Sequence, residues 1–183
     1  MRLLLLIAIG LGLSGTAGAR EYTSPQPGHT RSVILPVTGV APIIDGRLDD
    51  EAWDRATLAT DFWNSSLSQP PSDQTVVLIQ SDGVNLYFGF YCYDSQPEAI
   101  TAVKTRRDAG LGFDDHVSIE LDSYRNFRTI STYSVSANGT QNDAIAGGRA
   151  RKIEWKGDWK GAAARTDYGW SAEIAIPYSI LNY

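Results

Sequence analysis

Short stretches in which apolar and polar residues alternate cover most of the chain after residue 32. Apolar side chains at every second position give a strand one buried face and one exposed face. The stretches are rich in aromatic and β-branched residues, and Gly, Pro, Asn or Asp separate them. This pattern predicts strands at Val33–Val37, Leu58–Trp63, Thr75–Gln80, Leu86–Asp94, His116–Asp122, Thr129–Ala137, Gly161–Thr166 and Gly169–Ile176.

The alternation also indicates which faces are buried. In His116–Asp122 the odd-numbered positions from 117 to 121 are apolar, and the even-numbered positions are polar. In Gly169–Ile176 the even-numbered positions are apolar or small, which places Glu173 on the outward face. Ser81-Asp82-Gly83 and Asp167-Tyr168-Gly169 are typical of hairpin turns. Several short antiparallel strands with sparse helix predict an all-β sandwich.

Only two stretches, Asp49–Ala56 and Pro177–Leu181, predict short helices. Asp49 is a suitable N-cap, because its carboxylate can accept hydrogen bonds from the free N–H groups of the first turn. Trp53 and Ala56 are three residues apart and would pack one face of this helix on a core. Asp45-Gly46, just before it, predicts a turn.

The sequence predicts three regions. Residues 1–19 have a basic start, an apolar run and a small-residue cleavage site, which together indicate a secretory signal peptide; an uncleaved membrane anchor is the alternative. Residues 20–31 are polar and indicate a flexible leader. Residues 32–183 are expected to form one domain, incomplete at its C-terminal end. The protein should therefore be exported to the periplasm, the outer membrane or the medium.

Composition narrows the classes of partner and chemistry. The net charge of −5 gives no electrostatic support for a nucleic-acid partner. Cys92 is the only cysteine, so the chain has no internal disulfide. Its position on the same strand face as Leu86, Phe88 and Phe90 predicts a buried structural thiol rather than a nucleophile.

A charged loop is the first candidate site. Arg106-Arg107-Asp108 and Phe113-Asp114-Asp115-His116 flank a glycine-rich stretch. Asp114 and Asp115 could bind Ca²⁺, which takes several oxygen ligands on flexible loops. They could equally form ion pairs with Arg106 and Arg107, and the sequence leaves both possibilities open.

Aromatic side chains are the second candidate, because the apolar C–H faces of sugars stack on flat rings. Trp155 and Trp159 lie four residues apart in a polar loop, where both surface binding and packing remain open. Trp53 and Trp170 lie on apolar faces and are expected in the core.

Catalytic chemistry is not indicated. Glu120, Asp122, Glu173 and Asp115 could supply the two carboxylates of a glycosidase, but nothing favours any pair. The two histidines have no zinc-ligand spacing, and no nucleophile elbow or phosphate-binding loop is present. We expect a binding domain, not an enzyme.

One motif, I-D-G-x-L-D-x-x-x-W at residues 44–53, resembles the opening of carbohydrate-binding modules of family 9. It is more similar to the family-9-like domain that begins a group of bacterial outer-membrane proteins of unknown function. The resemblance runs from about Val40 to Leu181 through Asn85–Phe90, Arg106–Asp108, Asp114–Asp122 and Gly169–Pro177. It implies a jelly-roll-like antiparallel β-sandwich that binds a poly- or oligosaccharide and is linked to carbohydrate catabolism.

The resemblance also implies where a ligand would bind. Sugar-binding members clamp a chain end between two Trp, one just before the acidic strand, where this chain has Gly112-Phe113. The second Trp comes from a later segment that this sequence lacks, and a sugar-binding Glu of those modules aligns near Ser118. Phe113 and the Trp155/Trp159 loop would then stack on sugar, with Arg107, Asp114 and Asp115 taking hydroxyls or calcium. A downstream barrel or glycosidase domain is implied in longer relatives. The alternative is a structural domain on such a barrel, without a sugar ligand.

Overall fold

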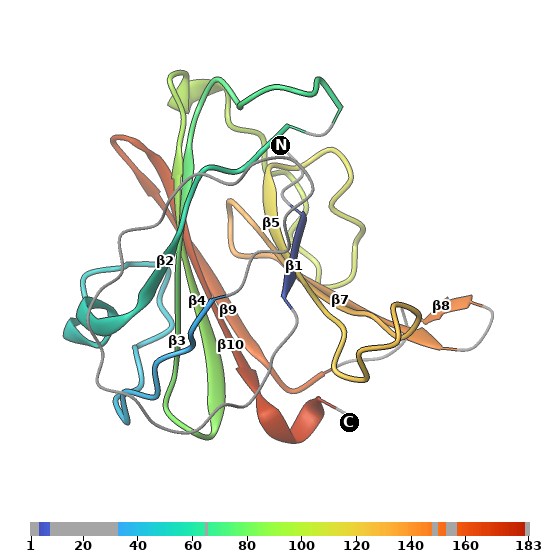
Figure 1. Cartoon of the computed structure of the whole chain (residues 1–183). Coiled ribbons are helices and arrows are strands. Elements are labelled where there is room, and N and C mark those ends of the chain that lie inside the picture. The colour runs from blue at the N-terminus through green and yellow to red at the C-terminus, as the bar shows by residue number, and fades with distance from the viewer. Residues whose placement is uncertain (1–3, 8–32, 65, 148–149, 153–156, 182–183) are drawn as a thin grey trace.

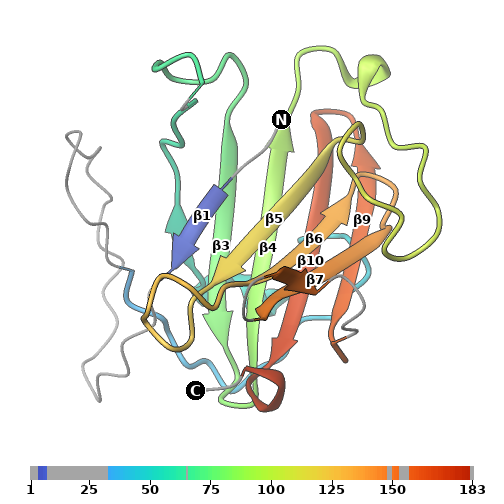
Figure 2. The same ribbon diagram turned by 90° about the vertical axis from the view of Figure 1, so that its right-hand side faces the viewer.

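Two five-stranded sheets face each other in a computed structural model, which describes residues 4–7, 33–64, 66–147, 150–152 and 157–181 (Figures 1 and 2). The first sheet, called sheet A, has the order β1-β5-β6-β7-β8. Its strands are β1 (Leu4–Ile7), β5 (His116–Leu121), β6 (Ser131–Ser136), β7 (Gln141–Gly147) and β8 (Ala150–Lys152). The second, sheet B, has the order β2-β3-β4-β10-β9. Its strands are β2 (Thr57–Ala59), β3 (Thr75–Ser81), β4 (Asn85–Tyr93), β10 (Gly169–Pro177) and β9 (Lys160–Thr166).

All neighbouring strands are antiparallel except β1, which pairs in parallel with β5. The predicted all-β antiparallel sandwich is therefore confirmed. β1 lies inside the predicted signal peptide, so a chain cleaved after Ala19 would have β5 at that edge of sheet A. No helix within the described ranges is long and apolar enough to cross a membrane.

The main core lies between the two sheets, as the alternation predicts. Val117, Ile119 and Leu121 of β5 face the apolar side chains of β4 and β10. Cys92 and Trp170 are both buried in this core, which confirms the two predictions made for them. The hairpin turns at Asp82-Gly83 and Asp167-Tyr168 also lie where the sequence predicts them.

A second, smaller core covers the outer face of sheet B. Trp53 is buried there against Leu78, Tyr87 and Ala175, with Ile44 and Leu48 packed beside them. The segment crosses the sheet so closely that a Cβ on Gly46 would lie 2.5 Å from the carbonyl carbon of Ala163. The segment from Ile44 to Arg55, which contains the opening motif, thus turns at Gly46 and packs on this sheet through Trp53. We call this segment the clamp.

The structure corrects the expectation that Glu173 is an exposed residue on the outward face of its strand. It does point away from the main core, but it is fully buried beneath the clamp. Its Oε2 accepts hydrogen bonds from the backbone N–H groups of Asp45 (2.9 Å) and Gly46 (2.8 Å). Its Oε1 accepts one from the Trp53 indole (2.9 Å).

The predicted helices are also corrected. The first is a short 3₁₀ helix, η1 (Glu51–Arg55), and the second is η3 (Tyr178–Ile180); a further turn, η2 (Pro97–Ala99), follows β4. The cap position of η1 is Asp50 rather than Asp49, and no side chain caps its first turn. The Asp50 carboxylate instead accepts a hydrogen bond from the Ile43 N–H (2.8 Å).

Three strand predictions differ from the structure by more than one residue at an end. Val33–Val37 is not a strand and makes one isolated bridge, from Val37 to Ser81. Leu58–Trp63 shortens to Thr57–Ala59, and Thr129–Ala137 to Ser131–Ser136. β7 and β8 were not predicted, because their sequences are polar and do not alternate.

Candidate functional site

The candidate site lies at the end of sheet A where β5 begins and β6 turns into β7 (Figure 2). The residues from Thr101 to Asp115, called the 101–115 loop, run beside this turn. The Asn138 side-chain amide donates to the carbonyl oxygens of Ala102 (3.1 Å) and Lys104 (2.7 Å). The Thr140 hydroxyl donates to the same Lys104 oxygen (2.6 Å). These bonds hold the loop against the end of the sheet.

Asp114 and Asp115 fasten the loop from its other end. Asp114 Oδ2 accepts a hydrogen bond from the Lys104 N–H (2.8 Å), and Asp115 Oδ2 accepts one from Thr101 N–H (2.9 Å). Asp114 is buried, and its Oδ1 has no hydrogen-bond partner in the described part of the chain. These contacts support a positioning role for the pair. Within the same described ranges, no group of three or more His, Cys, Asp or Glu side chains is arranged around a common metal position. Calcium binding by Asp114 and Asp115 stays a prediction.

Arg107 forms its ion pair with a residue that the sequence analysis did not single out. Its Nη2 donates to Asp143 Oδ1 (2.9 Å) and to the Gly157 carbonyl oxygen (2.8 Å). Asp143 is fully buried on β7, and its Oδ2 accepts from the Gly157 N–H (2.7 Å). The buried carboxylate is therefore satisfied by one guanidinium and one amide. The Arg107 side chain remains 33% exposed, so part of the guanidinium still faces solvent.

The prediction that Trp159 stacks on sugar is corrected, because its ring is buried and presents no face to a ligand. Its exposed fraction is only 4%. The ring packs edge-on against Tyr133, with centroids 5.5 Å apart and planes at 84°, and the Arg107 Cζ lies 5.7 Å from its centroid. Trp159 thus packs on Tyr133 and holds the Arg107 guanidinium through a cation–π contact. Trp155, its predicted partner in the loop, lies outside the described residues.

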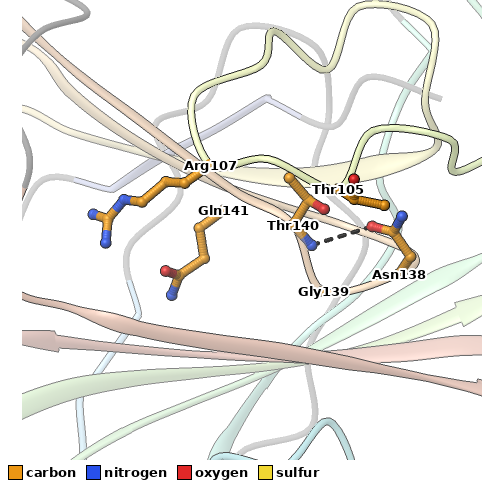
Figure 3. Close-up of a pocket in the computed structure, with 6 residues that line it drawn as sticks. All are labelled: Thr105, Arg107, Asn138, Gly139, Thr140 and Gln141. Atoms are coloured by element: carbon orange, nitrogen blue, oxygen red, sulfur yellow. Dashed lines mark hydrogen bonds between the residues drawn. The ribbon is translucent and has the colours of Figure 1, made fainter.

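A pocket opens between the 101–115 loop and the β6–β7 turn, with a volume of about 280 Å³ (Figure 3). Its lining consists of a guanidinium, two side-chain amides, two hydroxyls and a glycine, from Thr105, Arg107, Asn138, Gly139, Thr140 and Gln141. Such a lining offers hydrogen-bond donors and acceptors but little apolar surface. It suits a ligand rich in hydroxyl groups.

Phe113 is the exposed aromatic side chain of the same loop. At 91% exposure it is the most exposed large apolar side chain of the described residues. The outer face of sheet A is also polar: Ser118 of β5 and Ser134 of β6 share a hydrogen bond of 2.7 Å, and Thr132 and Glu120 face each other at the next position on that face. The 101–115 loop therefore carries both an exposed aromatic ring, Phe113, and Arg107 of the polar pocket.

The carboxylates that could have formed a hydrolytic pair do not meet. Glu120 lies on the outer face of sheet A, whereas Glu173 lies under the clamp on the outer face of sheet B. The Asp122 carboxylate accepts hydrogen bonds from backbone N–H groups of the β5–β6 loop. The Asp115 carboxylate accepts one from the Thr101 N–H of the 101–115 loop. Two carboxylates facing each other across a cleft, as glycoside hydrolysis requires, are not found among these four.

Comparison with known proteins gives a fold likeness. No protein-family model matches the chain, and no curated protein sequence does. The similar solved structures include two that each have a TM-score of 0.56. One is a family 9 carbohydrate-binding module from Caldicellulosiruptor kristjanssonii in complex with cellotriose, at 19% identity over 78% of this chain and 66% of that one. The other is a protein from Bacteroides uniformis ATCC 8492 named as a candidate carbohydrate-binding protein, at 11% identity over 69% of this chain and 62% of that one. The chain thus spans slightly less than two thirds of either structure, and the fold resembles that of family 9 modules.

Proposed function

We propose that this chain is a non-catalytic carbohydrate-binding domain whose site lies at the 101–115 loop. The observation that carries the proposal is the exposed Phe113 ring in the same loop as the polar pocket around Arg107. The fold likeness to a module solved with cellotriose supports it. We further propose that the domain is a family 9 type of carbohydrate-binding module and that it is exported. It would serve carbohydrate catabolism as part of a larger polypeptide.

The chemistry of the site follows from its two kinds of surface. A sugar ring would lay its C–H face on Phe113, which removes apolar surface of both partners from water. Its hydroxyls would bond the solvent-facing part of the Arg107 guanidinium and the Gln141 and Thr105 side chains. Arg107 is held by Asp143 and by the Trp159 ring, so its direction is fixed before the ligand arrives, and little conformational entropy is lost on binding.

The test is calorimetric titration with a panel of neutral oligosaccharides that includes cellotriose, in calcium and in EDTA. Phe113→Ala should weaken binding by about tenfold, as expected for the loss of one stacked ring of about 1–2 kcal/mol. Trp63→Ala is the matched control, since Trp63 is another exposed aromatic on a loop that lies outside the site. Binding that is equal in both variants, or absent for every glycan, would contradict the proposal.

The second candidate function is a structural domain that packs on another part of a larger protein and has no sugar ligand. Two exposed valines at the β3–β4 turn support it: Val84 lies in the turn, and Val37 lies beside Gly83. Adding a charge at both positions would weaken such packing and leave glycan binding unchanged. The glycan titration and this pair of substitutions therefore distinguish the two functions.

A further inference from the structure

The loop between β5 and β6 gathers exposed aromatic and cationic side chains. Phe127 is 77% exposed and Tyr124 is 49% exposed, and Arg125 and Arg128 are exposed between and beside them. In the described part of the chain neither guanidinium has an ion-pair partner. A chain with a net charge of −5 thus presents two unneutralised positive charges on one short loop.

This loop is held in one shape by two side chains at its base. The Asp122 carboxylate is buried and accepts hydrogen bonds from the N–H groups of Asn126 (3.2 Å) and Phe127 (2.6 Å). The Asn126 side-chain oxygen accepts from the N–H groups of Arg128 (2.8 Å) and Thr129 (2.9 Å). The exposed rings and guanidinium groups therefore project from a fixed backbone.

The backbone conformation of the loop is unfavourable for the residues it carries. Arg125 has φ 53° and Phe127 has φ 55°, in the left-handed region that residues with a large side chain rarely adopt. Phe127 gains no burial in return, since it points into water. Conformational strain of this kind is concentrated at binding and active sites.

We propose that the β5–β6 loop is a second binding site, specific for carbohydrates that carry carboxylate groups, such as uronic acid polymers. Phe127 and Tyr124 would stack on sugar rings, and Arg125 and Arg128 would form paired hydrogen bonds with the carboxylates. The site extends the proposed glycan-binding function to a different chemical class. It is separate from the Phe113 site, because the two loops lie at opposite ends of β5, a strand about 20 Å long.

An acidic glycan fits this loop better than an anionic lipid surface. Recognition of anionic lipid typically uses a cluster of four to eight Lys or Arg, whereas this loop carries two Arg. A sugar carboxylate needs only one guanidinium to form a bidentate pair, and the ring next to it supplies the stacking surface. The number of cationic groups therefore favours a saccharide over a lipid surface.

The experiment compares the binding of polygalacturonate with that of its fully methyl-esterified form, which removes the charge and keeps the sugar. Arg125→Gln/Arg128→Gln should weaken polygalacturonate binding by at least about tenfold, because charge-assisted hydrogen bonds are among the strongest polar contacts. Phe127→Asn should also weaken it, and this variant should fold well, because Asn tolerates positive φ. Arg47→Gln/Arg55→Gln is the matched control, with the same charge change on two exposed arginines of the clamp.

Three results would overturn the inference: equal binding of the two polymers, equal loss in the loop variant and the control variant, or binding to phosphatidylglycerol vesicles but not to polygalacturonate. The neutral panel with Phe113→Ala reports on the proposed function separately. Phe113-dependent binding of neutral sugars without polygalacturonate binding would refute the second site alone. Polygalacturonate binding that depends on Arg125 and Arg128, without binding of any neutral sugar, would support the second site and contradict the first.

Discussion

The free energy of unfolding should fall as the pH rises from about 4.5 to about 7, because of one buried carboxyl. Glu173 is fully buried under the clamp, and burial raises its pKa from 4.5 to about 7, although the N–H groups of Gly46, Trp53 and Asp45 oppose the change. Between these two pH values the folded chain holds a proton that the unfolded chain has released. The free energy of unfolding therefore decreases by about 1.4 kcal/mol per pH unit, or about 3 kcal/mol over the whole window.

Urea unfolding followed by tryptophan fluorescence at pH 5, 6, 7 and 8 measures this dependence. The indole of Trp53 bonds to Glu173, so its emission also reports the state of the clamp. Glu173→Gln should flatten the curve between pH 5 and 7, because an amide does not titrate there. Stability that rises between pH 5 and 7, or a fall of the same size in Glu173→Gln, would refute the reasoning.

Three further predictions concern single side chains, each read from urea or chemical-modification experiments. Gly46→Ala should lower the free energy of unfolding by about 2–4 kcal/mol, because the new Cβ meets the Ala163 backbone at φ +92°; Gly110→Ala, with open space around it, should cost only about 1 kcal/mol. Asp143→Asn should lower the free energy of unfolding by about 1–3 kcal/mol, because the amide NH₂ group cannot accept the hydrogen bond from the Gly157 N–H and the charge of the partly exposed Arg107 loses its partner, whereas Asp158→Asn, at an exposed position, should change it little. Burial raises the pKa of the Cys92 thiol well above its usual range, so a thiol reagent should label it only after urea unfolds the chain; fast labelling in buffer would contradict its place in the core.

Strands with strong alternation could be predicted from the sequence, and polar strands could not. β4 and β10 differ from their predicted bounds by one residue, because an apolar side chain occupies nearly every inward position. β7 was missed because its sequence, Gln-Asn-Asp-Ala-Ile-Ala-Gly, contains a charged residue at an inward position. That residue, Asp143, is neutralised by an arginine 36 positions earlier, and no local pattern reports such a partner.

The loop that carries the candidate site could be predicted from the sequence, but only part of its contacts could be. The glycine-rich charged stretch does form a loop at one end of the sandwich, with Phe113 exposed on it. Asp114 and Asp115, for which calcium binding and ion pairs with the arginines were both open, accept hydrogen bonds from backbone N–H groups of their own loop. The polar neighbours of Trp159 in the sequence did not decide between the surface and the core. Its burial depends on Tyr133, which comes from another strand.

The clamp imposes an order on folding. Asp45 and Gly46 bond to a glutamate 128 and 127 residues further along, and the neighbouring strands β4 and β10 of sheet B pair residues that are 76 to 92 positions apart. Contacts between such distant parts of a chain form late and make folding slow. Until β10 has been synthesised, Trp53 can pack on Leu78 of β3 and Tyr87 of β4 but lacks Ala175 and the Glu173 carboxylate, and β4 has a free edge. The clamp is therefore completed only after β10, the last strand in the described part of the chain, has been made.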